Sequence, residues 1–260
     1  MTVVDTHCHA ARGWFEPVET LMYQMERNGV DKAVLVQIRG KYDNSYELGL
    51  RKRHPGKFTV AVLVDTKRPD APATLEKWAR EGAAGIRLGP GERSPGADPL
   101  AIWRKAAQLG LAVSSLGTPA EFASPEFSAL VAALPDLKVV IEHYAGAKPE
   151  PNMDWPAFAK ALELAKYPNT YIKIGGFAEL LPRPFPYQWP TFTEEPKALR
   201  MIYDAFKPRR MMWGSDFPPV ASREGYANAL AFPRDRVSYF TPDDKRWIFG
   251  ETALSVWRFG

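Results

Sequence analysis

The sequence predicts an α/β protein, a closed (β/α)8 TIM barrel in a single domain that covers residues 1–260. Three observations lead to this prediction. Eight short, apolar, β-branched segments recur along the chain, helically spaced segments lie between most of them, and the length is common for α/β barrels. Apolar strands that alternate with amphipathic helices indicate a parallel sheet covered on both faces. Eight such units close into a barrel.

The expected strands are residues 3–10, 32–38, 58–65, 84–89, 111–117, 137–144, 170–176 and 210–216. The clearest expected helices are residues 17–29, 72–82, 99–110 and 156–167, and several end in Gly or Asn, as helices tend to. An open, doubly wound sheet is the structural alternative. It would more often carry a glycine-rich phosphate turn after its first strand, where this chain has HCHAARGW. The barrel is therefore favoured.

Composition narrows the class of protein. A hydrophobic share of 45% is enough for a large core, and no apolar run is long enough to cross a bilayer. The formal charge is +4, and the basic clusters at 51–54 and 208–210 are too short for a nucleic-acid arm. We expect neither a nucleic acid nor a membrane as partner. One cysteine excludes an intramolecular disulfide and the first residues do not resemble a secretory signal, so we expect a cytoplasmic location.

The segment VVDTHCHA, residues 3–10, places two of the four histidines two positions apart. Alternate side chains of a strand share one face, so His7 and His9 are expected to point the same way, with Asp5 below them. The two imidazoles could converge on one metal ion or one substrate. The alternative is a strand with incidental polar residues, and these eight residues alone do not separate the two interpretations.

Polar residues at the other strand ends separate them, because the active site of a (β/α)8 barrel lies at the carboxyl ends of its strands. The polar residues expected at these ends are His7, His9, Arg39, Asp65, Arg87, Ser114, Ser115, Glu142, His143, Tyr144, Lys173 and Asp216. Three of the four histidines thus share one face of the barrel. The fourth, His54, is expected to be a surface or capping residue in a turn on the opposite side. This grouping predicts a functional site.

Asp216 adds a carboxylate to the three imidazoles. It has a structural interpretation, as the N-cap of a helix. It also has two chemical ones: a carboxylate beside imidazoles can ligate a metal ion such as Zn²⁺, or act as the general base that takes a proton from an attacking water. We favour the chemical interpretations.

Four motifs together resemble the amidohydrolase superfamily. They are DTHCH at 5–9, GIRL at 85–88, IEHYAG at 141–146 and WGSDFP at 213–218. The chain looks like a member of the amidohydrolase-2 branch, which includes 2-pyrone-4,6-dicarboxylate lactonase, sugar-acid lactonases and decarboxylase relatives. HPGKF at 54–58 and FGETALSVWRF at 249–259 are also typical of that branch. The resemblance covers essentially the whole chain.

The resemblance implies catalytic roles for His7, His9, His143 and Asp216, with Asp216 activating water for attack on a ring ester carbonyl. The same four residues are the expected ligands if the site holds one divalent metal, Zn or Mn. Strand five lacks a histidine and strand four lacks a lysine or glutamate ligand, so a binuclear centre is not expected. The site could also work without metal, as some lactonases of this branch do.

Several residues are expected to bind a small carboxylated substrate. Arg39 and Arg87 are the expected carboxylate anchors, because the planar guanidinium matches a carboxylate. Arg87 has a competing interpretation in such a barrel, as part of a structural ion pair. The remaining candidates are Lys173, which could instead stack beneath the site, and Tyr144, Tyr187, Trp189 and Trp14, with Phe15 beside Trp14. The connection 176–196 is long and is expected to form a lid or pocket wall; the alternative is a contact within a homo-oligomer.

The predicted function is therefore a hydrolase of the amidohydrolase-2 type that opens a lactone of a carboxylated or sugar-acid substrate. The main alternative is a metal-dependent nonoxidative decarboxylase, a carbon–carbon lyase acting on an aromatic or muconic-type acid. A further alternative is a barrel that only binds a small acid, against which the intact Asp216 argues.

Overall fold

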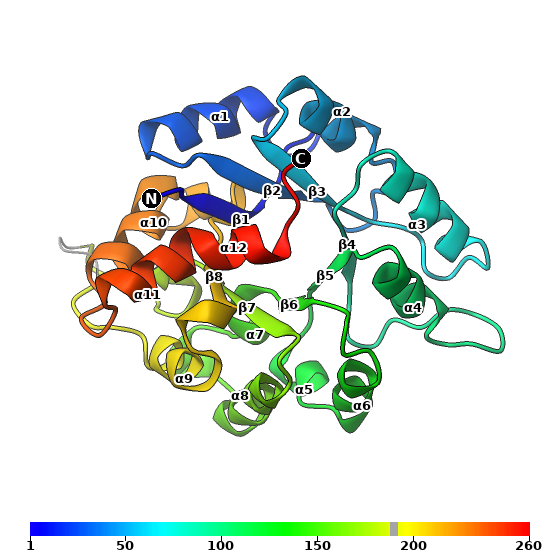
Figure 1. Ribbon diagram of the computed structural model, residues 1–260. Helices are drawn as coiled ribbons and strands as arrows, with labels where there is room; N and C mark the ends of the chain where they lie inside the picture. Colours follow the sequence, from blue (N-terminus) through cyan, green and yellow to red (C-terminus); the bar gives the residue numbers. More distant parts are fainter. Residues whose placement is uncertain (188–191) are drawn as a thin grey trace.

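The computed structural model describes residues 1–187 and 192–260. Its eight strands are parallel and pair in sequence order, which confirms the predicted (β/α)8 barrel. Figure 1 shows the strands at the centre with the helices around them. The strands are β1 (Val4–Cys8), β2 (Lys32–Val36), β3 (Phe58–Val62), β4 (Gly85–Leu88), β5 (Ala112–Ser115), β6 (Val139–Ile141), β7 (Thr170–Ile174) and β8 (Met211–Trp213). Each is shorter than expected, so most of the predicted site residues lie at strand ends or in the loops that follow.

The barrel closes between β1 and the segment after β8. The amide of Asp216 donates to the carbonyl of His7 at 2.7 Å, and the amide of His9 donates to the carbonyl of Phe217 at 2.8 Å. The β1–β2 pairing shifts register between Asp5 and Cys8, which is the signature of a bulge. Asp5 therefore does not lie below the two histidines as expected. Its buried carboxylate accepts hydrogen bonds from Ser215 and fixes β1 to the segment after β8.

Helices follow the strands as predicted, and short helical turns interrupt the connections. The α-helices are α1 (Val18–Arg27), α2 (Ser45–Arg53), α3 (Ala71–Arg80), α4 (Ala101–Gln108), α5 (Pro119–Phe122), α6 (Pro125–Ala133), α7 (His143–Gly146), α8 (Trp155–Leu162), α9 (Lys197–Phe206), α10 (Tyr226–Asp235), α11 (Pro242–Arg246) and α12 (Thr252–Val256). The 3₁₀ or π turns are η1 (Glu150–Asn152), η2 (Glu163–Lys166), η3 (Phe177–Glu179), η4 (Pro208–Arg210), η5 (Pro219–Ser222) and η6 (Trp247–Glu251). His54 caps the carboxyl end of α2, which confirms its predicted capping role.

The end of the barrel where the strands begin is filled by the C-terminal segment. Trp257 is 2% exposed and packs with Val34, Val140 and Met212 from three strands. Gly85 makes room for the indole, because a Cβ at this position would lie 2.6 Å from the Trp257 ring and 2.6 Å from a backbone oxygen of β5. Trp257 therefore forms the floor of the barrel interior, below Lys173, whose Nζ is 5.6 Å from the ring centroid.

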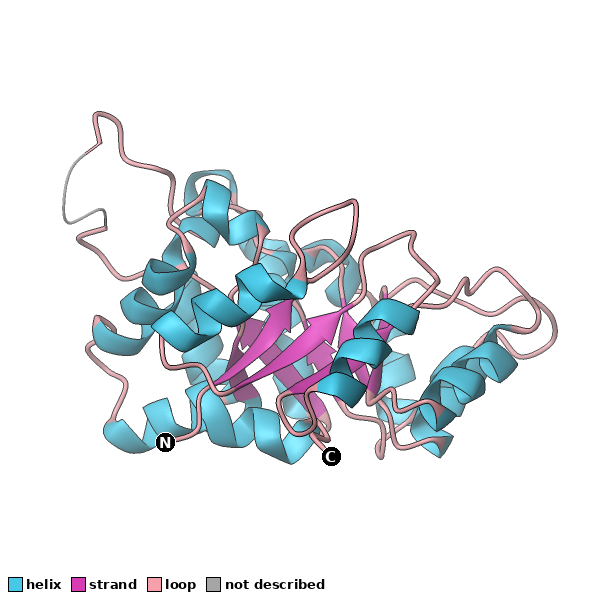
Figure 2. Cartoon of the chain, turned by 90° about the horizontal axis from the view of Figure 1, so that it is seen from above, coloured by secondary structure: helices cyan, strands magenta, loops and turns pink. Residues whose placement is uncertain are grey.

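The two ends of the barrel differ in character. Figure 2 shows both termini on one side of the molecule, while the described parts of the connection between β7 and α9 extend to the other side. The carboxyl ends of the strands, and thus the predicted site residues, face away from the Trp257 floor. None of the helices in the described parts of the chain combines the length and hydropathy that crossing a bilayer requires.

Candidate active site

The structure brings together the four residues predicted to be catalytic. The rings of His7 and His9 are 5.0 Å apart, and the rings of His7 and His143 are 4.5 Å apart. Oδ1 of Asp216 lies 3.7 Å from Nε2 of His9 and 3.9 Å from Nε2 of His7. His7, His9 and Asp216 are buried, whereas the side chain of His143 is 23% exposed. Three of the four side chains thus lie deep in the site, and the imidazole of His143 lies at its mouth.

An unusual backbone turn aims His143 at the site. His143, Tyr144 and Ala145 have φ values of 48°, 52° and 60°, and Gly146 continues with 67°. The segment labelled α7 is therefore a left-handed turn, a conformation that costs L-residues about 1–2 kcal/mol each. Gly146 is required here because a Cβ would lie 1.9 Å from the carbonyl oxygen of Gly117. Such local strain is typical of functional sites, where the surrounding structure enforces it.

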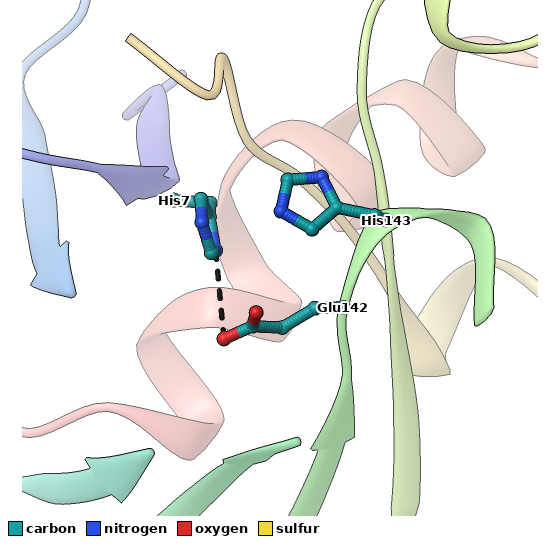
Figure 3. A group of neighbouring side chains, drawn as sticks. All are labelled: His7, Glu142 and His143. Atoms are coloured by element: carbon teal, nitrogen blue, oxygen red, sulfur yellow. Dashed lines mark ion pairs between the residues drawn. The ribbon is translucent and has the colours of Figure 1, made fainter. Parts of the chain in front are cut away.

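A buried ion-pair network lies below His7. Glu142 accepts a hydrogen bond of 2.8 Å from Arg87 and one of 2.6 Å from the hydroxyl of Ser114. Lys173 donates to Ser114 Oγ at 2.7 Å and lies 3.1 Å from Nδ1 of His7. Figure 3 shows the Glu142 carboxylate below the His7 ring, with 3.7 Å between Oε1 and Nδ1, and His143 beside it. Strands β4, β5 and β7 each contribute one polar side chain to this network.

The network holds its charges through mutual pairing. Burial opposes ionisation of Glu142, but Arg87 and Lys173 lower the pKa of this carboxyl to about 2. Burial lowers the pKa of Lys173 to about 8, with Glu142 partly opposing the shift. Burial, followed by the charge of Lys173, lowers the pKa of His7 well below its usual value. His7 is consequently neutral, beside the ammonium of Lys173 and the carboxylate of Glu142.

A second network orients Asp216 and His143. Arg223 donates two hydrogen bonds of 3.1 Å to Oδ2 of Asp216 and lies 3.6 Å from Glu179. Glu179 in turn lies 3.2 Å from Nδ1 of His143. Burial alone would raise the pKa of Asp216, but His9, His143 and Arg223 lower it. Burial alone would lower the pKa of His143, but Glu179 and Asp216 raise it. The site thus pairs an ionised carboxylate with an imidazole that is readily protonated.

By distance, part of this cluster can hold a divalent cation. One ligand atom each from His7, His9 and Asp216 lies within 4.8 Å of the others, and Nε2 of His7 is buried without a hydrogen bond. His9 fits the role of ligand, because its Nδ1 donates to the carbonyl of Val36 at 2.7 Å and leaves a lone pair on Nε2. His7 does not fit it, because the nearest neighbour of its Nδ1 is the ammonium of Lys173, which has no acceptor. As arranged here, the donor set of His7, His9 and Asp216 is therefore incomplete.

The two predicted arginine anchors occupy different environments. Arg87 is 7% exposed and bonds to Glu142 and to the carbonyl of Gln37, so the structure shows the ion pair that was the alternative interpretation. Arg39 is exposed and lines a hollow of about 490 Å³ beside β4 and β5. Of the two predicted anchors, Arg39 is thus the one whose guanidinium is available to a ligand.

The predicted aromatic contacts also divide. Tyr144 is fully buried and its hydroxyl donates to the carbonyl of Gly175 at 2.6 Å, so it packs in the core and does not face the site. Trp14 is 69% exposed and packs beside Phe15, whose ring stacks on His9 at 5.4 Å. Tyr187 is 62% exposed and lines a hollow of about 410 Å³ that also includes Arg223. Trp189 lies outside the described residues.

Sequence reasoning missed Glu179 and Arg223 and gave Glu142 and Ser114 no role. Glu179 ends the turn η3 after β7, and Arg223 follows the turn η5 after β8. One signal for them was available, since both are charged residues a few positions beyond a predicted strand end. The side chains that they bind could not be inferred from spacing alone.

The fold and the site together define a class of protein. Histidines and an ionised aspartate converge at the carboxyl ends of the strands in a (β/α)8 barrel, which is where enzymes of this fold place their catalytic residues. A buried carboxylate beside imidazoles is suited to activate water. These features define a barrel enzyme of the hydrolase class.

The chain belongs to the amidohydrolase family, whose sequence model matches residues 4–259. This confirms the resemblance found in the sequence. The chain is 30% identical over 284 residues to L-fucono-1,5-lactonase of Burkholderia ambifaria, covering 98% of this chain and 95% of the relative. It is 26% identical over 232 residues to 4-sulfomuconolactone hydrolase of Hydrogenophaga intermedia, covering 84% and 69%.

A solved structure from Pseudomonas putida, assigned as a 2-pyrone-4,6-dicarboxylic acid hydrolase, has the same fold. It superimposes with a TM-score of 0.75 at 23% identity, covering 98% of this chain and 97% of the other. Family membership and fold therefore agree over essentially the whole chain.

Proposed function

We propose that this protein hydrolyses a lactone by attack of water on the ring carbonyl, with Asp216 as general base. One observation carries the proposal. Arg223 holds Oδ2 of Asp216, so that Oδ1 is directed at Nε2 of both His7 and His9. A base needs its proton-accepting atom fixed and its pKa below the working pH, and Asp216 has both.

His9 supports the attacking water in this proposal. Its Nε2 lies 3.7 Å from Oδ1 of Asp216, which is too long for a direct hydrogen bond. Both atoms carry lone pairs, since Nδ1 of His9 donates to Val36. A water molecule placed between them can donate one hydrogen bond to each. Transfer of the proton to Asp216 then leaves a hydroxide directed by His9.

His143 is the proposed electrophilic partner. Its side chain is partly exposed at the mouth of the site, and Glu179 and Asp216 raise its pKa. A protonated imidazole donates a hydrogen bond to the carbonyl oxygen as negative charge develops there. When the ring opens, the same proton is available to the departing alkoxide.

The proposed substrate class is supported by the names of two relatives and by the exposed guanidinium of Arg39. The relatives act on lactones, according to their names, and those names include a sulfomuconolactone and a sugar-acid lactone. Arg39 lines a hollow of about 490 Å³ and can bind a carboxylate. We therefore propose a carboxylated or sugar-acid lactone as substrate. Neither zinc nor manganese has a role in this proposal, because the donor set at His7 does not suit a cation.

The proposal is tested with three lactones: L-fucono-1,5-lactone, 4-sulfomuconolactone and 2-pyrone-4,6-dicarboxylate. Hydrolysis is followed by proton release, before and after treatment with a chelator, for the wild type and for Asp216→Asn. We expect the wild type to open at least one lactone at a rate that the chelator leaves unchanged, and the variant to be inactive. Equal rates for the two proteins would remove Asp216 as the base. Activity that the chelator abolishes would show that a metal is required.

A further inference from the structure

The two histidines of the HxH motif differ in what surrounds Nδ1. Nδ1 of His9 faces the carbonyl of Val36 at 2.7 Å, and a carbonyl only accepts. Nδ1 of His7 faces Nζ of Lys173 at 3.1 Å, and an ammonium only donates. A neutral imidazole carries one proton, and the partner of one ring nitrogen decides which nitrogen holds it.

Lys173 has few other places to direct its protons. Its side chain is 2% exposed, so bulk water does not solvate it. One proton goes to Ser114 Oγ at 2.7 Å, because the Ser114 hydroxyl is itself committed to Glu142 at 2.6 Å. Oε1 of Glu142 is 3.9 Å from Nζ, beyond hydrogen-bond distance. Nδ1 of His7 is thus the second acceptor of the ammonium.

Glu142 is the competing partner of His7, since its carboxylate could accept a hydrogen bond from a protonated Nδ1. Its Oε1 is 3.7 Å from Nδ1 and already accepts the Ser114 hydroxyl, while its Oε2 accepts Arg87. A proton on Nδ1 would also face a proton of Lys173 at a buried position. Geometry therefore favours the bond from Lys173.

We propose that Lys173 is a positioning residue that holds the proton of His7 on Nε2. His7 then presents a hydrogen-bond donor to the site, whereas His9 presents a lone pair. Metal ligation through Nε2 needs a lone pair on both rings. The Lys173–His7 contact thus makes the HxH pair a donor–acceptor pair for substrate oxygens and water, and selects against a divalent cation. This inference rests on the proposed function only where it assigns Nε2–H of His7 to substrate oxygens and water. Its tests do not require turnover of a substrate.

The first test is the tautomeric state of His7 by ¹⁵N NMR of wild-type protein labelled on histidine and freed of metal. With four histidines in the chain, single substitutions of His9, His54 and His143 by Gln assign the signals. We expect the correlation pattern of an Nε2–H tautomer for His7 and of an Nδ1–H tautomer for His9. An Nδ1–H pattern for His7 would overturn the proposal, and this measurement needs no variant of Lys173.

The second test is zinc titration of wild type and Lys173→Gln, by calorimetry without substrate. The glutamine amide oxygen can accept a hydrogen bond from Nδ1–H, which leaves the lone pair on Nε2. We expect Lys173→Gln to bind zinc at least tenfold more tightly than the wild type. Lys41→Gln is the control, because the ammonium of Lys41 pairs with Glu47, with 3.0 Å between Nζ and Oε1, and not with His7. The zinc affinity of this control variant should equal that of the wild type. Equal zinc affinity of Lys173→Gln and wild type would contradict the proposal. Loss of lactone hydrolysis would not affect either result.

Discussion

The guanidinium of Arg223 donates two hydrogen bonds, both of 3.1 Å, to the same oxygen of Asp216. The other oxygen of that carboxylate is left to face the two histidines of β1. A residue in the loop after β8 thereby sets both the orientation and the charge of the proposed base. Arg223 does not need to touch the substrate for this effect.

Replacing Arg223 by Met should lower kcat about tenfold or more with a smaller change in KM, because an unclamped Asp216 accepts the proton less efficiently. Arg223 is one of the groups that lower the pKa of Asp216, so its loss should move the acid limb of kcat/KM to higher pH. Full pH–rate profiles check both effects. Arg234→Met, which removes a surface pair with Asp235, should keep the wild-type profile. An unmoved acid limb would exclude this role of Arg223.

Replacing Asp216 by Asn should reduce kcat about 10²–10⁴-fold, the range that general-base catalysis contributes. The amide keeps the size of the side chain but does not take up a proton. Binding of the substrate, measured by calorimetry with the inactive variant, should persist. Asp70→Asn is the control, because Asp70 pairs with Arg68 on the exposed surface. If the barrel only binds a small acid, neither the wild type nor Asp216→Asn will show turnover.

Replacing Glu142 by Gln should destabilise the fold by about 3–5 kcal/mol, since Arg87 and Lys173 would remain as buried cations without their carboxylate. Urea unfolding at neutral pH measures the change. Glu163→Gln removes an exposed pair with Lys160, and its unfolding midpoint should equal that of the wild type. If both variants unfold at the same midpoint, the network below His7 contributes little stability.

Lys173 should give the stability a distinctive dependence on alkaline pH. Its pKa is about 8 in the folded protein, below the 10.5 of an unperturbed lysine. Between these values the unfolded chain binds the proton and the folded chain does not, so stability rises with pH in this window. The unfolding free energy of the wild type minus that of Lys173→Met should therefore increase from pH 8 to 10.5, by at most about 3 kcal/mol. A constant difference would indicate an unshifted lysine.

Replacing Trp257 by Ala should cost about 3–5 kcal/mol, the usual range for truncating a buried aromatic residue. Thermal or urea unfolding measures the loss. Gly85→Ala offers a complementary test, because the added Cβ would lie 2.6 Å from the same indole. Both substitutions should destabilise the barrel. Near-wild-type stability of Trp257→Ala would mean that the floor contributes little to folding.

The barrel and its catalytic cluster could be predicted because each depends on local patterns. Apolar runs spaced along the chain predicted all eight strands, and strand topology then brought His7, His9, His143 and Asp216 to one end. The end of the barrel at which a strand finishes is set by the strand topology and does not depend on how individual side chains pack. A motif that follows a strand is therefore assigned to the correct end of the barrel once the fold is known.

Details that depend on backbone irregularity were not predictable in this way. The expectation for Asp5 assumed regular alternation, which the register shift in β1 interrupts. The expectation for Tyr144 assumed an extended strand, whereas the left-handed turn that begins at His143 buries the phenol. Glu179 acts through His143, which is distant in the sequence, and Arg223 reaches back across the turn η5 to Asp216. Their roles follow from tertiary contacts, which spacing does not encode.

The Trp257 floor determines how small molecules and protons reach the ion pairs inside the barrel. With the indole packed against the strand starts, Lys173 and Glu142 communicate with solvent across the opposite end, past the histidines. Protons released during turnover and hydrogen isotopes exchanging with bulk water must take the route that the substrate takes. A bound ligand should therefore slow solvent exchange at the buried lysine as well as block the reaction.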